Sequence, residues 1–175
     1  MIMRKGQTAM EYLMTYGWAI LIIMVVLAVL FYLGVLNPSS VTPSQCVFPA
    51  GFTCVTNQLK TSGKLYLVIG QGTGKTIMIT GITCTQNTSM DFPTSGVISF
   101  GGNNNVNVSS GSQVTLGNPT FNGFVNQTNC TMANGSIMTG TVGGVYNGKI
   151  YINYTELDSG LVRVVTGTYT AKYEP

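Results

Sequence analysis

The sequence has no histidine, and only 7% of its 175 residues are charged. Histidine performs much of the acid–base catalysis near neutral pH and is a common metal ligand, so both kinds of site lack their usual residue. Glu156 and Asp158 stand two apart in "TELDSG" (155–160), which we interpret as a solvated turn rather than a carboxylate pair acting on sugars. No nucleophile is paired with a base, and the sequence therefore disfavours an enzyme.

Clusters of lysine and arginine are also lacking. The formal net charge is only +3, and two of the eight basic residues, Arg4 and Lys5, precede a long apolar segment. A nucleic-acid footprint needs clustered basic residues, so we expect no nucleic-acid partner. The rest of the chain is rich in Thr, Asn and Gly but has enough Val, Ile, Leu, Phe and Tyr to bury a core, which disfavours disorder.

The cysteines are Cys46, Cys54, Cys84 and Cys130. They include no C-x-x-C pair and have no histidine to help them, so we expect no metal site and no cofactor. An even number of cysteines beyond an apolar segment indicates disulfides in an oxidising compartment. Four cysteines allow three pairings. We favour Cys46–Cys54, which closes a short loop containing proline and glycine, together with Cys84–Cys130.

Residues 12–36 carry no charge, and this stretch is longer than the roughly 20 residues that cross a bilayer as a helix. Arg4 and Lys5 precede it, and no basic residue follows until Lys60. The positive-inside rule therefore places the N-terminus in the cytoplasm and residues 37–175 outside. The segment is too long for a secretory signal and has no small-residue cleavage site after it. A plain signal anchor would account for all of these features except the polar residues, including Glu11, that lead into the apolar segment.

The stretch "RKGQTAMEYLMTYGWAILIIMVV" (4–26) resembles the class III signal of archaeal type IV pilins. In that family a short basic leader ends in Gly, a prepilin peptidase cuts before a Gln, and a Glu stands at the fifth mature position. The resemblance implies a leader over residues 1–6, cleavage between Gly6 and Gln7, and Glu11 as that glutamate. The archaellin signal has a Gly/Ile-rich mature start and fits this sequence less well.

The resemblance further implies that the helix stays with the mature protein and enters the core of a filament. We predict it over residues 7–36, about 45 Å at 1.5 Å per residue, ended by Asn37-Pro38. A carboxylate buried among helices needs a partner, which the new α-amino group of Gln7 on a neighbouring subunit would provide for Glu11. The alternative is a solvated Glu11 at the membrane interface, near the positive end of the helix dipole.

After a linker over residues 37–45, the chain favours strands. The predicted strands are 64–69, 76–84, 96–100, 112–116, 136–142, 149–154 and 162–173. Turn signals between them are Gly101-Gly102, Asn134-Gly135, Gly143-Gly144 and Asn147-Gly148. We therefore expect an α+β chain: a long apolar helix followed by an all-β head over residues 46–175, of the immunoglobulin-like β-sandwich kind.

The segment "GQGTGKT" (70–76) resembles a phosphate-binding loop but has Ile69 where the motif needs its first glycine. A strand pattern follows it where a helix should begin. We interpret it as a glycine-rich turn between two strands.

The head carries six N-x-S/T sequons, at Asn87, Asn107, Asn126, Asn129, Asn134 and Asn153. Glycans must lie on the surface. We expect Asn153 to face solvent, opposite Ile150, Ile152 and Tyr154, and Cys130 to restrict access to Asn129.

Taken with the resemblance, these features predict a structural subunit of an archaeal adhesion pilus. The alternative is a minor pilin, or a membrane-anchored adhesin or binding module, that does not build the main fibre. The implied partners are further copies of the chain, the membrane, a prepilin peptidase, an assembly platform with its ATPase, and an oligosaccharyltransferase.

Overall fold

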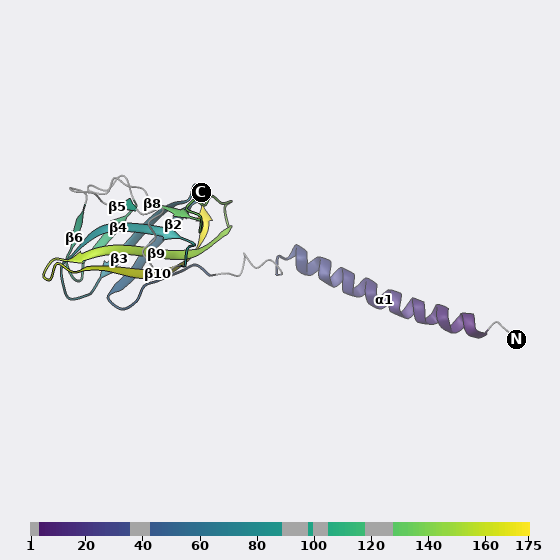
Figure 1. Cartoon of the computed structure of the whole chain (residues 1–175). Helices are drawn as coiled ribbons and strands as arrows, with labels where there is room; N and C mark the ends of the chain where they lie inside the picture. Colours follow the sequence, from purple (N-terminus) through teal and green to yellow (C-terminus); the bar gives the residue numbers. More distant parts are fainter. Residues whose placement is uncertain (1–3, 36–42, 89–97, 100–104, 118–127) are drawn as a thin grey trace. The chain divides into compact units, whose positions relative to one another are not determined.

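The computed structural model describes residues 4–35, 43–88, 98–99, 105–117 and 128–175 (Figure 1). The chain divides into two compact units, Met1–Thr42 and Pro43–Pro175. The first contains helix α1 (Arg4–Tyr32), and the second, the head, contains the strands, so the chain is α+β. The boundary between the units falls inside the segment predicted as a linker, and the first strand already begins at Gln45.

Helix α1 forms because apolar and other helix-compatible residues fill its length and no proline interrupts it. It begins at Arg4, three residues before Gln7, and ends at Tyr32 rather than at the predicted Leu36. The earlier end has a local cause. Gly34 takes a φ of 69°, the left-handed conformation that commonly terminates helices, and its N–H donates to the Phe31 carbonyl at 3.1 Å. The predicted terminator, Asn37-Pro38, lies outside the described residues.

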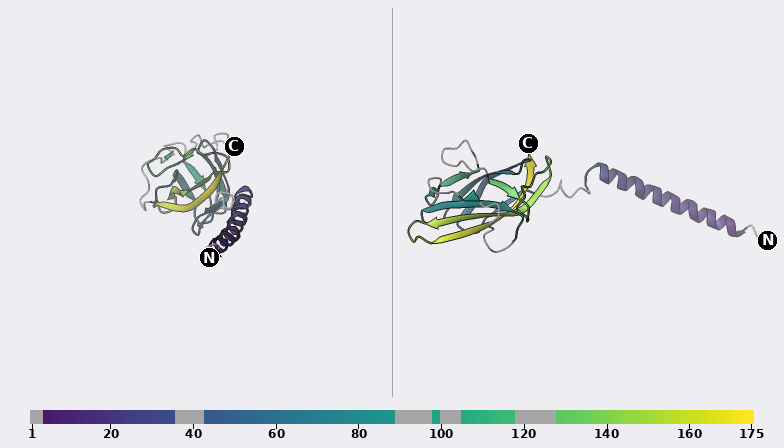
Figure 2. Two further views of the ribbon diagram at one scale, coloured as in Figure 1. Left: turned by 90° about the vertical axis from the view of Figure 1, so that its right-hand side faces the viewer. Right: turned by 45° about the horizontal axis from the view of Figure 1, so that its top comes forward.

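Within the described residues the head has ten strands. They are β1 (Gln45–Val47), β2 (Phe52–Lys60), β3 (Lys64–Gln71), β4 (Ile77–Thr85), β5 (Ile98–Ser99), β6 (Val106–Val108), β7 (Gln113–Leu116), β8 (Thr128–Thr131), β9 (Val145–Glu156) and β10 (Val162–Glu174). The two longest, β9 and β10, form an antiparallel hairpin that runs along the head (Figures 1 and 2).

The strands join into one sheet that closes on itself. Following the ring, β10 pairs with β9, β9 with β4, β4 with β8, β8 with β3, β3 with β2, and β2 again with β10. Strand β8 closes one seam, since it pairs with β4 through Cys130 and with β3 through Thr128 and Asn129. The structure therefore corrects the predicted immunoglobulin-like β-sandwich. Its two sheets would face each other without such joints, whereas here the joints close the sheet into a barrel.

The core lies inside this barrel. Strand β3 alternates regularly, with Leu65, Leu67 and Ile69 buried on the face that the sequence predicted. Strands β4 and β9 add Ile79, Ile82 and further buried side chains from their inward faces. Residues 72–76 of the glycine-rich segment 70–76 form a turn between β3 and β4, as predicted, and its first two residues belong to β3. There the buried Gln71 side chain donates to Thr73 Oγ1 at 2.9 Å and to the Lys75 carbonyl at 2.6 Å.

Two local predictions are wrong. Residues 136–142 do not form a strand beyond one bridge at Ile137, because the backbone N–H groups of Met138 and Gly140 donate to two separate segments, at Cys130 and Thr61. Asn147-Gly148 is not a turn but part of β9. Gly148 is needed there for close packing, since a Cβ would lie 2.6 Å from the Tyr146 hydroxyl and 2.7 Å from the Thr85 carbonyl. The predicted turn at Gly101-Gly102 lies outside the described residues.

Candidate functional site

Helix α1 is exposed along its described side chains. The span Ala9–Tyr32 has a mean hydropathy of 2.5 and none of it is buried, and it is the one described helix long and apolar enough to cross a membrane. Its 24 residues would reach about 36 Å, more than the roughly 30 Å of a bilayer core. An apolar surface of this kind requires lipid or other helices around it. The helix is compatible with a membrane anchor or with a signal sequence.

Glu11 is the single acidic residue of α1 and lies about two turns after the start of the helix at Arg4. Its side chain is exposed, and among the described residues it forms no ion pair. Its backbone carbonyl accepts a hydrogen bond from Thr15 Oγ1 at 2.9 Å. Gly6 and Gln7, the predicted cleavage residues, both lie within the helical backbone of α1. Among the side chains that the structure describes, none is paired with the Glu11 carboxylate.

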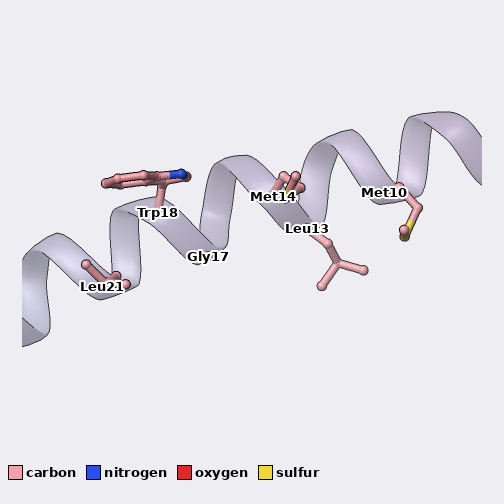
Figure 3. Close-up of a pocket in the computed structure, with 6 residues that line it drawn as sticks. All are labelled: Met10, Leu13, Met14, Gly17, Trp18 and Leu21. Atoms are coloured by element: carbon pink, nitrogen blue, oxygen red, sulfur yellow. The ribbon is translucent and has the colours of Figure 1, made fainter.

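A shallow apolar groove of about 370 Å³ follows one side of α1 (Figure 3). It is lined by Met10, Leu13, Met14, Gly17, Trp18 and Leu21. Gly17 has no side chain and faces open space, since a Cβ added there would meet nothing within 4 Å. Small residues let helix backbones approach closely in membranes, so this groove offers a neighbouring helix a place to pack.

An aromatic pair lies close to Glu11. The rings of Tyr12 and Tyr16, one helical turn apart, have centroids 4.4 Å apart, and the Tyr12 hydroxyl donates to that of Tyr16 at 2.9 Å. Tyrosines of this kind favour the membrane–water boundary, where the ring is apolar and the hydroxyl is hydrated. Their position is consistent with the N-terminal end of the span lying at such a boundary.

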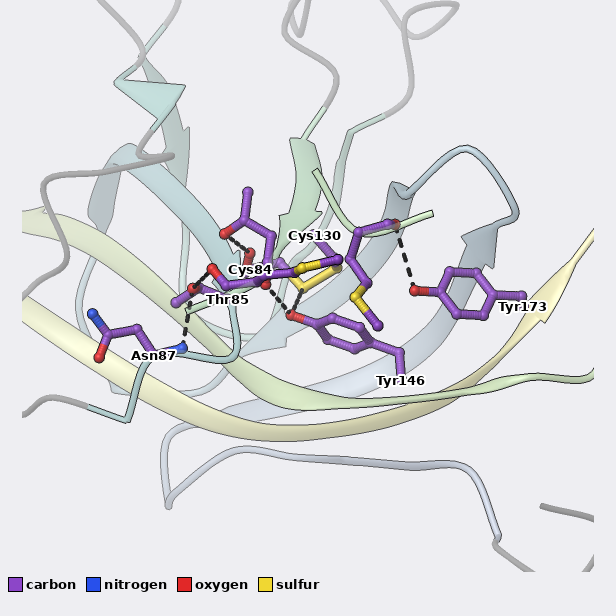
Figure 4. The surroundings of a disulfide bond; sticks show 9 residues. Cys84, Thr85, Asn87, Cys130, Tyr146 and Tyr173 are labelled. Carbon is purple, nitrogen blue, oxygen red and sulfur yellow. Dashed lines mark hydrogen bonds between the residues drawn. A yellow bond between two sulfur atoms is a disulfide. The ribbon is translucent and has the colours of Figure 1, made fainter. Parts of the chain in front are cut away.

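The four cysteines form two disulfides, Cys46–Cys54 and Cys84–Cys130, the pairing that the sequence analysis favoured. The first ties β1 to β2. The second ties β4 to β8 where the two strands run parallel (Figure 4). Both bonds indicate an oxidising, extracellular location for the head.

Hydrogen bonds surround the buried disulfide. The Tyr146 hydroxyl lies 3.6 Å from Cys84 Sγ and donates to the Thr131 carbonyl at 3.1 Å (Figure 4). Thr131 Oγ1 donates to the Cys84 carbonyl at 3.2 Å. Burial raises the pKa of Tyr146 well above its usual range, so its hydroxyl stays protonated and able to donate. These contacts hold β8 in its place in the ring of strands and so stabilise the fold.

The predicted glycosylation sites differ in access. Asn107 and Asn134 are exposed, and Asn134 Oδ1 accepts from the Ser136 N–H at 3.0 Å in a turn. Asn129 and Asn153 are half-buried, and the Oδ1 atom of each is buried without a hydrogen-bond partner among the described residues. Asn153 does lie opposite the core side chains of β9, but it is less exposed than expected because β4 packs beside it.

The remaining two sequons are at Asn87 and Asn126. Asn87 is half-buried, and its carbonyl accepts from the Tyr151 hydroxyl at 3.1 Å. Asn126 lies outside the described residues. Among the sequon asparagines that the structure describes, Asn107 and Asn134 are therefore the exposed ones.

Glu156 corrects the prediction of a solvated turn. It is buried, and its carboxylate accepts from Lys75 Nζ at 2.7 Å, from Arg163 Nε at 2.7 Å and from Ser159 Oγ at 2.9 Å. The hydrogen bond from Lys75 comes first among the causes that hold the pKa of Glu156 below its usual value. Asp158 is exposed and does not join this cluster. Through these two cations the carboxylate ties the β9–β10 hairpin to the turn between β3 and β4.

The sequence analysis missed both partners of Glu156. A buried carboxylate must be paired, but the burial of Glu156 depends on strands that are distant in the sequence, so no local pattern identified Lys75 and Arg163. No group of three or more metal-ligating side chains occurs in the part of the chain that the structure describes. A comparison with known protein families and with curated proteins found no match to this sequence.

Proposed function

We propose that this protein is a structural subunit of an archaeal type IV adhesion pilus, polymerising through its N-terminal helix into an extracellular filament. The observation that carries the proposal is an apolar helix, with none of its Ala9–Tyr32 span buried, that has a single acidic residue, Glu11, five positions after Gly6. A membrane anchor alone does not need that carboxylate. A helix that packs among other copies of the chain would use the carboxylate to pair with a charged group of a neighbouring subunit.

The mechanism begins with removal of residues 1–6 by a prepilin peptidase, which leaves α1 on the mature protein. Cleavage creates a positively charged α-amino group at Gln7. When the helix leaves the bilayer and packs among other copies, the Glu11 carboxylate loses its contact with water. The Gln7 amine of a neighbour then pairs with it and sets the register between subunits, while the groove at Gly17 admits the neighbouring helix.

The other partners follow from this proposal. The subunit is membrane-anchored with its N-terminus in the cytoplasm before assembly, and an assembly platform with its ATPase extrudes the filament. An oligosaccharyltransferase modifies Asn107 and Asn134, the exposed acceptors, which adds polar surface to a head with few charges. We propose adhesion as the use of the filament, because the low net charge gives no electrostatic basis for binding DNA.

A minor pilin or an anchored surface module is the second candidate. It is favoured by the length of the Ala9–Tyr32 span, which suits permanent residence in a bilayer as well as extrusion from it. Abundance separates the two candidates. A main-fibre subunit dominates the sheared surface fraction, whereas a minor or anchored protein stays scarce there.

Replacement of the glutamate tests the assembly mechanism. In Glu11→Ala cells we expect leader removal and membrane insertion to be unchanged. Filament yield should fall by about 100-fold, because an unpaired buried amine costs roughly 3 kcal/mol or more. Glu11→Gln should assemble as poorly, since the amide keeps the size but not the charge. Asp158→Ala, an exposed acid of the head, is the matched control. Normal filament yield from Glu11→Ala would refute the pairing of Glu11 with Gln7.

A further inference from the structure

Strand β10 has an open edge. On one side it pairs with β9 from Val162 to Lys172. On the other side, among the described residues, it pairs only with β1 at residues 168–170 and with β2 at residues 173–174. The edge over residues 162–167 is therefore unpaired. We call this segment the β10 edge.

The edge is open because β1 stops short of it. Strand β1 ends at Val47, and Pro49 follows, which has no N–H to offer a neighbouring strand. The Pro49 carbonyl accepts from the Phe52 N–H at 3.2 Å, so the chain turns away from β10 at this point. A groove of about 510 Å³ is left beside the edge, with Phe52, Tyr154 and Val165 among its lining residues.

The backbone groups of alternate residues face this open side. The Glu156 N–H donates to the Leu161 carbonyl at 2.9 Å, and the Glu156 carbonyl accepts from the Gly160 N–H at 2.8 Å. This one-residue bulge at the turn leaves Glu156 and Leu161 at a hydrogen-bonded position of the ladder. Hydrogen-bonded and non-hydrogen-bonded pairs alternate in antiparallel strands, so Arg163 and Val165 bond to β9. The N–H and C=O groups of Val162, Val164 and Thr166 consequently point to the open side.

The side chains of the edge favour strand pairing. Val162 and Val164 are 66% and 45% exposed, although both are apolar and β-branched. The edge has no proline, no bulge and no unpaired charge, the devices that normally prevent strands from associating. Its one charged residue, Arg163, is already paired with Glu156 at 2.7 Å.

We propose that the β10 edge is a docking site for the same edge of a second copy of this chain. The outward-facing backbone groups at 162, 164 and 166 are symmetric about Val164. An antiparallel second strand therefore matches each of them, with Val164 opposite Val164 and Val162 opposite Thr166, through about six hydrogen bonds. The same-face pairs are β-branched, and Arg163 meets the uncharged Val165 of the other copy, so no like charges are opposed.

Such a contact is two-fold and closed, so it links heads in pairs and does not extend into a sheet. It is independent of the proposed filament, because it uses only the head. Within a pilus system it would join heads to one another and add a lateral contact to those made by the helices.

A cysteine placed at the symmetry point tests this contact. All four native cysteines are in disulfides, so Val164→Cys in the full-length protein, purified in detergent, carries the single free thiol. Hydrogen-bonded antiparallel residues have Cα atoms about 5.5 Å apart, which suits a disulfide. On mild oxidation we expect Val164→Cys to shift to the dimer mass on a non-reducing gel. Thr168→Cys is the matched control, exposed on the same face but already opposite Val47 of β1, and should stay monomeric.

A second variant removes the contact without a cross-link. Val164→Pro deletes an N–H that faces the open side and leaves the bonds to β9 in place, so we expect a wild-type melting temperature and loss of the dimer in sedimentation. A monomeric Val164→Cys protein, or equal cross-linking of Thr168→Cys, would overturn the proposal. Neither readout needs leader removal or filament assembly, so failure here and failure of the proposed function are distinguishable.

Discussion

Glu156 shows how a single residue fixes the tip of the β9–β10 hairpin. Its carboxylate holds Lys75 from the β3–β4 turn and Arg163 from β10, while its own N–H and C=O bond to Leu161 and Gly160. Lys75 and Arg163 are 45% and 52% exposed, so solvent screens both ion pairs, and the contribution to stability is modest. The cluster acts mainly by joining β9, β10 and the β3–β4 turn at one point.

The depressed pKa of Glu156 predicts a particular dependence on pH. A carboxyl whose pKa is lower in the folded state stabilises the fold above the unfolded value of about 4.5, and this contribution is lost as the pH falls through the lower, folded value. We therefore expect the melting temperature of the wild type to exceed that of Glu156→Gln at pH 7 and to approach it below pH 4. Asp158→Asn, in the same turn, is the control and should track the wild type at both pH values. A difference that persists undiminished in acid would contradict this role.

Individual residues were predictable where a local rule applied. The alternation of β3 identified Leu65, Leu67 and Ile69 as core, because a strand with one buried face has a period of two. The burial of Glu156 and the half-burial of Asn153 depend on strands far away in the sequence. Local patterns carry no information on such neighbours, so these environments were not predictable.

At the scale of the elements, the two disulfides act at the two places where the ring of strands is completed. Cys84–Cys130 joins β4 to β8, the strand that closes one seam. Cys46–Cys54 joins β1 to β2 across the opposite seam, where β10 and β2 pair only at residues 59–60 and 173–174. Few hydrogen bonds cross either seam, and the covalent links compensate for that.

Removing each disulfide should have an effect graded by the loop that it closes. The sequence separations are 46 and 8 residues. In the chain-entropy account these correspond to about 4 and about 2.5 kcal/mol of unfolding free energy. We expect Cys84→Ser/Cys130→Ser to be the more destabilised double variant in urea unfolding of the detergent-solubilised chain, since it also places hydroxyls in the core. The opposite order would show that the β1–β2 seam carries more of the stability.

The elements themselves were predictable in proportion to their hydrophobicity. Helix α1 and strands β3, β4 and β10 have long apolar or β-branched patterns, and the sequence identified all four. Strand β8 is "TNCT", four polar or small residues, and its burial comes from its position between β3 and β4. Strands β1, β2 and β6 were also missed, because β1 and β6 have only three residues each and β2 has no regular alternation of apolar and polar residues. Without β8, a sandwich was the natural expectation and the closed ring could not be foreseen.

At the scale of the whole molecule, the chain combines an exposed apolar helix with a separately folded head. The helix cannot remain exposed to water, and the head carries two disulfides, which are typical of an oxidising compartment. The membrane is one environment that satisfies the helix, and a bundle of identical helices is the other. The proposed function holds that the helix passes from the membrane into a bundle of identical helices. This passage requires cleavage before the helix.

The mass of the N-terminal peptide in filaments sheared from source cells tests this central claim most directly. The account predicts that the protein in that fraction begins at Gln7, with the leader removed and α1 retained. A protein that keeps its leader, beginning at Met1 or Met3, and that is confined to the membrane fraction would contradict the account and identify α1 as an uncleaved anchor.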